Sequence, residues 1–237
     1  MTSATKHLRR TSAGRGQGFT IVELLVTVGV IALLVALLVP ALASMRGASH
    51  DTRCRANLRQ MALALGSYLL SNDEHFPISS HTTGTVTDPA AWLQSLVPHG
   101  FEGDVRRCPA DPFADARPSS YATNSYFEPL VAGIDFDPFT GQALPGGRTS
   151  AISRSPQVPH PATTFWAVEV PGASLIDHLH SVGWTRSAQI SSAMAVERHG
   201  ESSNVLFADA HDAPVRWRDI ERDFECGKNP FDPDAPR

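Results

Sequence analysis

One acidic residue lies inside the longest apolar stretch of this chain. Within residues 19–39, Glu23 is the only charged side chain. On insertion scales, a charge within an apolar membrane helix costs about 3 kcal/mol, and such residues usually have a specific partner. A carboxylate in lipid is tolerable only when it is neutralised, for example by an ammonium group beside it. We therefore interpret Glu23 as a functional residue.

Three residues near the C-terminus, His199, Asp209 and His211, have side chains of the types that bind divalent metals. Residues 204–208 and 215–218 favour a β-hairpin, which could bring the three together. A structural role is the simpler explanation, because an aspartate in a turn binds its own backbone. A histidine before a strand commonly bonds a carbonyl or a carboxylate.

Two further segments carry metal-ligand residue types. The sequence Asp-His-Leu-His at residues 177–180 would place alternate side chains on one face of a strand, but a solvated loop explains it more simply. Asp135 and Asp137 lie in the loop 133–141, where carboxylates could bind calcium. The D-x-D-x-D-G pattern of a calcium loop is incomplete there, so no metal ligand is assigned in either segment and no cofactor is expected.

The chain has three cysteines, Cys54, Cys108 and Cys226. If the domain that carries them is exported, disulfides are permitted. Three thiols allow three single pairings, and spacing alone does not choose among them.

Other kinds of chemistry find little support. The sequence has no P-loop, no G-x-S-x-G and no H-E-x-x-H motif, so we do not expect an enzyme.

Residues 1–18 contain four basic and no acidic residues, so their removal changes the net charge from −4 to −8. That balance argues against nucleic-acid binding.

The apolar stretch has the length of a membrane span. A helix over residues 19–39 would be about 32 Å long, close to the hydrocarbon thickness of a bilayer. The basic residues before it, Lys6, Arg9, Arg10 and Arg15, favour a cytoplasmic leader with the rest of the chain exported.

Three interpretations of this segment compete. A plain N-terminal membrane anchor is the simplest. A secretory signal peptide is the second, since Ala41-Leu42-Ala43 provides an A-x-A cleavage site, although signal apolar regions are usually about 7 to 15 residues long. The third interpretation depends on a family resemblance.

The segment Gly18-Phe19-Thr20-Ile21-Val22-Glu23 resembles the cleavage and methylation motif of type IV prepilins and type II secretion pseudopilins. The resemblance implies that a prepilin peptidase cuts after Gly18 and that Phe19 becomes N-methylated. Glu23 would then pair with the N-terminal amine of a neighbouring subunit and set the axial register. Pro40 matches the position of a helix-kinking proline in many such subunits.

Beyond Pro40 the helical pattern resumes. Apolar residues recur at intervals of three and four up to residue 72, which predicts an amphipathic helix with one core-facing stripe: Met45, Cys54, Leu58, Met61, Leu65 and Tyr68 or Leu69. Short strands follow, so we expect an α+β fold with a long helix packed on a small antiparallel sheet, as in pilins.

The expected organisation has five parts. Residues 1–18 are the leader, 19–39 the transmembrane and assembly helix, and 40–72 its amphipathic continuation. Residues 73–223 form the α+β head, and 224–237 form an irregular or mobile tail.

Several short motifs beyond residue 40 also resemble those of one subgroup of prepilin-like proteins. They include Cys54-x-x-Asn57-Leu58, Cys108-Pro109-x-Asp111, and an H-x9-D-G motif at His199 and Asp209. This comparison favours a Cys54–Cys108 disulfide. The chain has Ala210 where the subgroup has glycine, which suggests a positive-φ turn that alanine would strain by about 1 kcal/mol.

The resemblance implies a structural subunit that polymerises into a type IV pilus or a type II secretion pseudopilus. Expected partners are the prepilin peptidase, homologous subunits, an inner-membrane assembly platform and membrane lipid, with no nucleic acid. The chain would cross the inner membrane once and then enter a filament in the periplasm or at the cell surface. An exported envelope-binding domain that never polymerises is the alternative.

Overall fold

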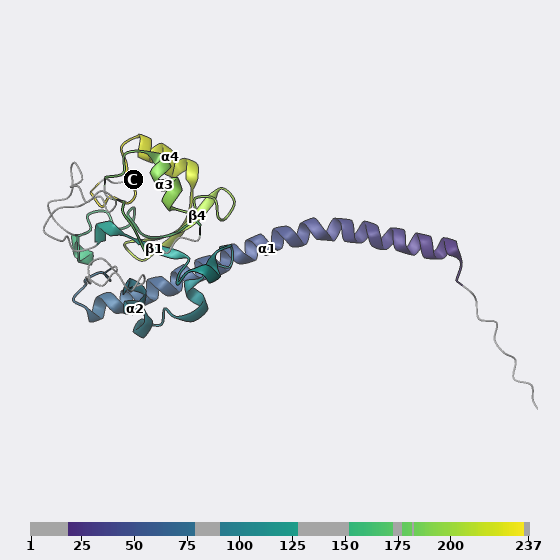
Figure 1. Ribbon diagram of the computed structural model, residues 1–237, viewed down its shortest axis with the longest axis horizontal. Helices are drawn as coiled ribbons and strands as arrows, with labels where there is room; N and C mark the ends of the chain where they lie inside the picture. Colours follow the sequence, from purple (N-terminus) through teal and green to yellow (C-terminus); the bar gives the residue numbers. More distant parts are fainter. Residues whose placement is uncertain (1–18, 79–90, 128–151, 173–176, 182, 235–237) are drawn as a thin grey trace, which may run out of the picture. The chain divides into compact units, whose positions relative to one another are not determined.

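The computed structural model describes residues 19–78, 91–127, 152–172, 177–181 and 183–234. The chain divides into two compact units, residues 1–45 and residues 46–237, and each unit is treated by itself below. The helices and strands, in chain order, are α1 (Ile21–Ser71), α2 (Ala91–Leu96), β1 (Tyr121–Asn124), β2 (Phe165–Glu169), β3 (His178–Leu179), α3 (Ser187–Ala193), β4 (Ser202–Phe207), β5 (Asp212–Arg216) and α4 (Trp217–Glu225) (Figure 1).

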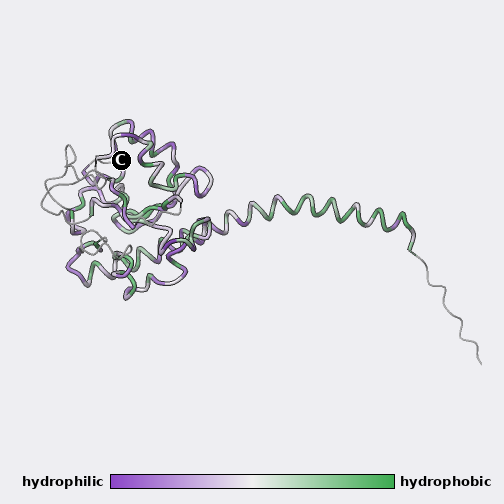
Figure 2. Tube along the Cα trace, in the orientation of Figure 1, coloured by the Kyte–Doolittle hydropathy of each residue, from purple (hydrophilic) through white to green (hydrophobic). Residues whose placement is uncertain are grey.

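The first unit contains the N-terminal part of α1. Its apolar side chains are all exposed, and the colouring of Figure 2 shows hydrophobic residues along most of this part of the helix. The helix includes a stretch long and apolar enough to cross a membrane. The helix continues through Pro40, which lacks the amide proton that would bond the carbonyl four residues earlier. The kink at Pro40 stays a prediction.

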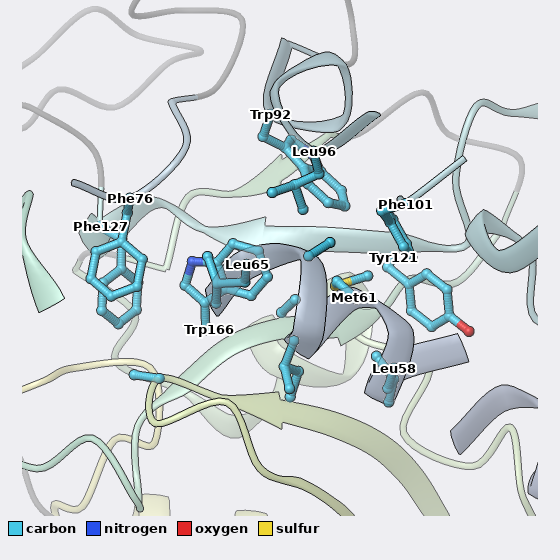
Figure 3. Close-up of a cluster of buried hydrophobic side chains, with 14 of the residues drawn as sticks. Leu58, Met61, Leu65, Phe76, Trp92, Leu96, Phe101, Tyr121, Phe127 and Trp166 are labelled. Carbon is cyan, nitrogen blue, oxygen red and sulfur yellow. The ribbon is translucent and has the colours of Figure 1, made fainter. Parts of the chain in front are cut away.

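The remaining part of α1 belongs to the second unit, where one stripe is buried: Cys54, Asn57, Leu58, Met61, Ala64 and Leu65. These positions recur at three and four, because 3.6 residues per turn bring them to one face. Figure 3 shows Leu58, Met61 and Leu65 packed with Tyr121 and Trp166 of the sheet. The predicted α+β architecture, a long helix on a small sheet, is confirmed. Met45, which the same spacing places on the stripe, is 67 % exposed.

The sheet has the strand order β3-β1-β2-β4-β5. Neighbouring strands are antiparallel except for β1 and β3, which pair in parallel. The sheet is therefore mixed, whereas the sequence pattern predicts an antiparallel one. Strand β3 begins more than fifty residues after β1 ends, so the relative direction of these two strands is not dictated by a tight turn.

Both faces of the sheet are covered. On one face lie α1 and α2, with a core that includes Trp92 and Trp166 (Figure 3). On the other face, α3, α4 and the segment around Phe231 pack against Phe165 and Val168 of β2. Burial on two faces explains why the sequence of β2, Phe-Trp-Ala-Val-Glu, is a continuous run of buried residues and does not alternate between apolar and polar residues.

Two expectations about the C-terminal half are wrong. Residues 177–180 are not a solvated loop, because His178 is only 3 % exposed and belongs to strand β3. Residues 217–225, part of which the sequence pattern assigns to a strand, form helix α4. The tail is irregular as expected, and within it Phe231 is fully buried and its carbonyl accepts a hydrogen bond from Asn124.

The β4–β5 hairpin is present, and Ala210 in its loop has a φ of +68°. The turn thus has the left-handed conformation in which glycine is strain-free and alanine is not. The Ala210 amide donates to Phe207, and the Phe207 amide donates to His211. These bonds hold the loop closed, so the strain at Ala210 is tolerated rather than relieved by a different turn.

We expect Ala210→Gly to raise the free energy of unfolding by about 1 kcal/mol, because it removes the left-handed strain. For a chain of this size that corresponds to about 2–4 °C in melting temperature. Thermal unfolding of the full chain in detergent measures the shift. Ala213→Gly, on neighbouring strand β5, is the matched control and should lower the melting temperature. A neutral or destabilising Ala210→Gly would show that the turn is not strained.

Candidate functional site

The predicted assembly residues lie at the start of α1. Gly18 and the leader lie outside the described residues, and Phe19 is 78 % exposed. Glu23 Oε2 accepts hydrogen bonds from the Thr20 amide at 2.9 Å and from Thr20 Oγ1 at 2.7 Å. The Glu23 amide in turn donates to Thr20 Oγ1 at 3.2 Å. Thr20 and Glu23 therefore form a reciprocal capping box.

This capping box gives Glu23 a local role that the sequence analysis missed, although the T-x-x-E spacing before an apolar run is its known signature. Both protein hydrogen bonds to the carboxylate fall on Oε2. The carboxylate therefore stabilises the helix start and carries a negative charge close to residue 19. A cap and an assembly contact are distinct roles, and suitable substitutions can separate them.

In the second unit, Cys54 of α1 and Cys108 are joined by a disulfide, which is the pairing that the family comparison favours. Cys226 is free and exposed. Both bonded cysteines are fully buried, and Asn57, one turn further along α1, donates to the Arg107 carbonyl at 2.8 Å. The bridge and this hydrogen bond hold the segment around Cys108 against α1.

A buried polar cluster adjoins the disulfide. We call it the Glu169 cluster, and it consists of Glu169, His199, Ser203 and Asn204. Glu169, on central strand β2, is fully buried. Its Oε1 lies 2.9 Å from His199 Nε2, and its Oε2 accepts from Ser203 Oγ at 3.2 Å and from the Asn204 amide at 3.0 Å. Every carboxylate oxygen thus has a polar partner, as a buried charge requires.

The Glu169 cluster is also connected to α1. Asp51 Oδ1 accepts from Asn204 Nδ2 at 2.8 Å and lies 3.4 Å from His199 Nδ1. His199 therefore has a carboxylate at each ring nitrogen. On the other side, His199 Nε2 lies 3.7 Å from Cys108 Sγ. Residues from α1, β2, the turn before β4 and the Cys108 segment meet at this imidazole.

A second buried group of charges surrounds Asp111. Its carboxylate accepts from Arg117, and Arg198 Nη2 lies 3.2 Å from Asp111 Oδ1. Burial alone would raise the pKa of the Asp111 carboxyl, but hydrogen bonds from Ser120 and Arg117 and the charge of Arg198 bring its pKa below the usual value. Arg117 and Arg198 also donate to the Val170 carbonyl. This group fixes the chain where β2 ends.

The structure separates the C-terminal motif into two places. His199 is buried in the Glu169 cluster, whereas Asp209 and His211 lie in the exposed hairpin loop. Asp209 Oδ1 accepts from the His211 amide at 3.2 Å and lies 2.6 Å from His211 Nδ1. Within the described part of the chain the three do not converge on one potential metal site. Asp209 has the turn-capping role, because its carboxylate binds backbone two residues ahead.

The other segments with metal-ligand residue types also give no site. His178 Nδ1 lies 2.6 Å from Asp177 Oδ1, and the rings of His178 and His180 meet edge to face with centroids 4.5 Å apart. Asp135 and Asp137 lie outside the described residues. Among the described residues, the four that converge as potential metal ligands are Cys54, Cys108, Glu169 and His199.

The sequence matches no protein-family model and no curated protein, and the fold matches no solved structure.

The lowered pKa of Asp111 makes the stability of the head depend on pH. An unfolded aspartate titrates near pH 3.9, and the folded carboxyl titrates below that. The contribution of Asp111 is thus complete above about pH 4 and is lost as the pH falls through the folded pKa. Asp111→Asn lacks it at every pH and removes the carboxylate that forms ion pairs with Arg117 and Arg198, which costs about 3–5 kcal/mol near neutrality.

We therefore expect the difference in unfolding free energy between wild type and Asp111→Asn to be largest at neutral pH and to shrink below about pH 4. Urea unfolding of the full chain in detergent between pH 7 and 3 measures it. Asp115→Asn is the matched control, because the Asp115 side chain is fully exposed. A difference that stays constant down to pH 3 would contradict the assignment.

Proposed function

We propose that this chain is a prepilin-like structural subunit that is cleaved after Gly18 and polymerises through the N-terminal part of α1. The filament is of the type IV pilus or type II secretion pseudopilus kind. The partners in this proposal are a prepilin peptidase, sibling subunits, an inner-membrane assembly platform and membrane lipid. The leader stays in the cytoplasm, and the head is exported before the subunit enters the filament.

The observation that carries the proposal is the exposed apolar surface of α1. From Phe19 to Met45 each large apolar side chain is at least half exposed, with values between 50 % and 80 %. An apolar surface of this extent is not stable in water and requires an apolar environment. Lipid provides it before assembly, and the packed helices of neighbouring subunits provide it afterwards. Because both environments are apolar, packing and polar contacts must favour assembly.

Glu23 supplies the polar contact in this proposal. The pairing partner is the N-terminal amine that cleavage after Gly18 creates on Phe19 of a neighbouring subunit. A carboxylate and an ammonium that meet in an apolar environment neutralise each other, and a buried polar pair of this kind can define the register of an assembly. The capping box with Thr20 holds the carboxylate at the helix start, where that amine would arrive.

The alternative is an exported envelope-binding domain, tethered or released, that does not polymerise. It would use the same α1 only as an anchor or lose it by cleavage after Ala43. Such a protein needs neither a free Phe19 amine nor the charge of Glu23, so the two proposals differ in simple experiments.

The first experiment is mass spectrometry of the mature N-terminus in a membrane fraction of cells that make the protein. We expect N-methylated Phe19, because Gly18 and Glu23 fit the peptidase motif. Ser44 at the N-terminus would indicate signal-peptide cleavage and a released domain. An intact Met1, or its loss alone, would leave a tethered protein and contradict filament assembly.

The second experiment separates the charge of Glu23 from its capping role. Glu23→Gln keeps a side-chain oxygen for the Thr20 bonds, since glutamine also serves in capping boxes, but removes the charge. Thr20→Ala keeps the charge and weakens the cap by about 1 kcal/mol. We expect Glu23→Gln chains to be processed but not recovered in sheared filaments, and Thr20→Ala chains to assemble. The opposite pattern would show that Glu23 acts only as a cap.

A further inference from the structure

Four side chains of zinc-ligand type converge in the interior of the head. They are Cys54 of α1, Cys108, Glu169 of β2 and His199, and their ligand atoms all lie within 4.8 Å of one another. In the structure the two sulfurs are bonded to each other and are not available to a metal. We propose that reduction of this disulfide converts the group into a binding site for one divalent metal ion of the zinc class.

The distances suit a tetrahedral ion. Bonds of about 2.0–2.3 Å at tetrahedral angles separate ligand atoms by about 3.3–3.8 Å. His199 Nε2 lies 3.7 Å from Cys108 Sγ and 2.9 Å from Glu169 Oε1. Opening the disulfide removes the short sulfur–sulfur contact. Rotations of the two cysteine side chains, with a slight widening of the 2.9 Å distance between His199 Nε2 and Glu169 Oε1, would then bring the four atoms to tetrahedral spacing.

The side chains and amides that contact His199 and Glu169 already have the arrangement that a metal site requires. A metal-bound histidine usually presents its other ring nitrogen to a carboxylate, and His199 Nδ1 lies 3.4 Å from Asp51 Oδ1. Ser203 and the Asn204 amide hold Glu169 Oε2. These contacts leave Glu169 Oε1 beside His199 Nε2, which itself lies 3.7 Å from Cys108 Sγ.

The charges also balance. Two thiolates, one carboxylate and a neutral imidazole around a divalent ion leave a net charge of −1. The guanidinium of Arg198, whose side chain is 4 % exposed, interacts with Glu169 and with Asp111. This buried positive charge lies close enough to offset the excess. The site would therefore be buried and, apart from the partly exposed Asp51 carboxylate beside His199, near neutral.

The redox step needs a dithiol reductant. Its two thiols lose two electrons and two protons as they form a disulfide, and the Cys54–Cys108 bond gains them to give two thiols. The metal ion then displaces one proton from each thiol, because only thiolates are good ligands. The metal replaces the covalent link between α1 and the Cys108 segment with a coordinate one.

The test uses the full chain in detergent with Cys226→Ser, so that no other thiol contributes. The protein is reduced with a dithiol, freed of it without oxygen, and titrated with Co²⁺ and then Zn²⁺. We expect one Co²⁺ per reduced chain, with the visible bands of a tetrahedral thiolate site, displacement by Zn²⁺, and no binding to the oxidised chain. If the reduced chain loses its fold, Zn²⁺ should restore the native circular dichroism.

Variants distinguish a metal site formed by all four ligands from metal binding by the two thiols alone. Asp51→Asn removes no ligand but alters the contacts to His199 Nδ1 and Asn204 Nδ2, and should weaken Zn²⁺ binding by about 10- to 100-fold. Cys54→Ser, Glu169→Gln and His199→Gln each remove a ligand and should weaken it further. Asp209→Asn, in the exposed hairpin loop, is the matched control and should bind like the parent. Absence of metal binding to the reduced chain, or equal affinity in the parent, Asp51→Asn and Glu169→Gln, would overturn the proposal.

Discussion

The buried carboxylate of Glu169 is the constraint on which the organisation of the head depends. A charge on the central strand of a sheet that is covered on both faces must find all of its partners inside the protein. His199, Ser203 and the Asn204 amide supply them from β4 and the turn before it. Asp51 then connects this group to α1. One buried charge thus fixes the pairing of β2 with β4 and the place where the helix lies on the sheet, and the Cys54–Cys108 bridge adds a covalent link at the same point.

The two parts of α1 follow different physical rules. In the second unit the helix has one buried stripe and an exposed face, as a helix on a sheet must. In the first unit it is apolar and exposed on every side, which no aqueous domain tolerates over such a length. A single continuous helix therefore carries one segment long and apolar enough to cross a membrane and one segment that packs on the sheet of the head. The capping box of Thr20 and Glu23 places the one acidic side chain at the end of the apolar segment, where it can stabilise the helix and present a charge.

The polar residues of the head divide into interior and surface groups. His199 belongs to the interior, where it has a carboxylate at each ring nitrogen and a disulfide sulfur beside it. Asp209 and His211 belong to the surface, where they complete a hairpin turn strained at Ala210. The motif that joins these residues in sequence therefore serves two separate structural roles, with nine residues between His199 and Asp209. The separation is explained by β4, whose length carries the chain from the cluster at its start to the turn at its end.

The sequence alone determined the structural features that depend on residues close together in the chain. Spacing of three and four predicted the buried stripe of α1, and the residue types around 209–212 predicted the hairpin, whereas the positive φ at Ala210 was suggested by the family resemblance. Local signals also marked Glu23, although its T-x-x-E cap was overlooked. Only the tertiary structure decided the parallel pairing of β3, the burial of Phe231 and the meeting of Asp51, Glu169 and His199. These residues lie far apart in sequence. The residues next to Glu169 in the chain do not indicate which distant side chains will pack against its buried carboxylate. For the same reason, the disulfide pairing came from family resemblance rather than from spacing, because three cysteines carry no information about which two will meet.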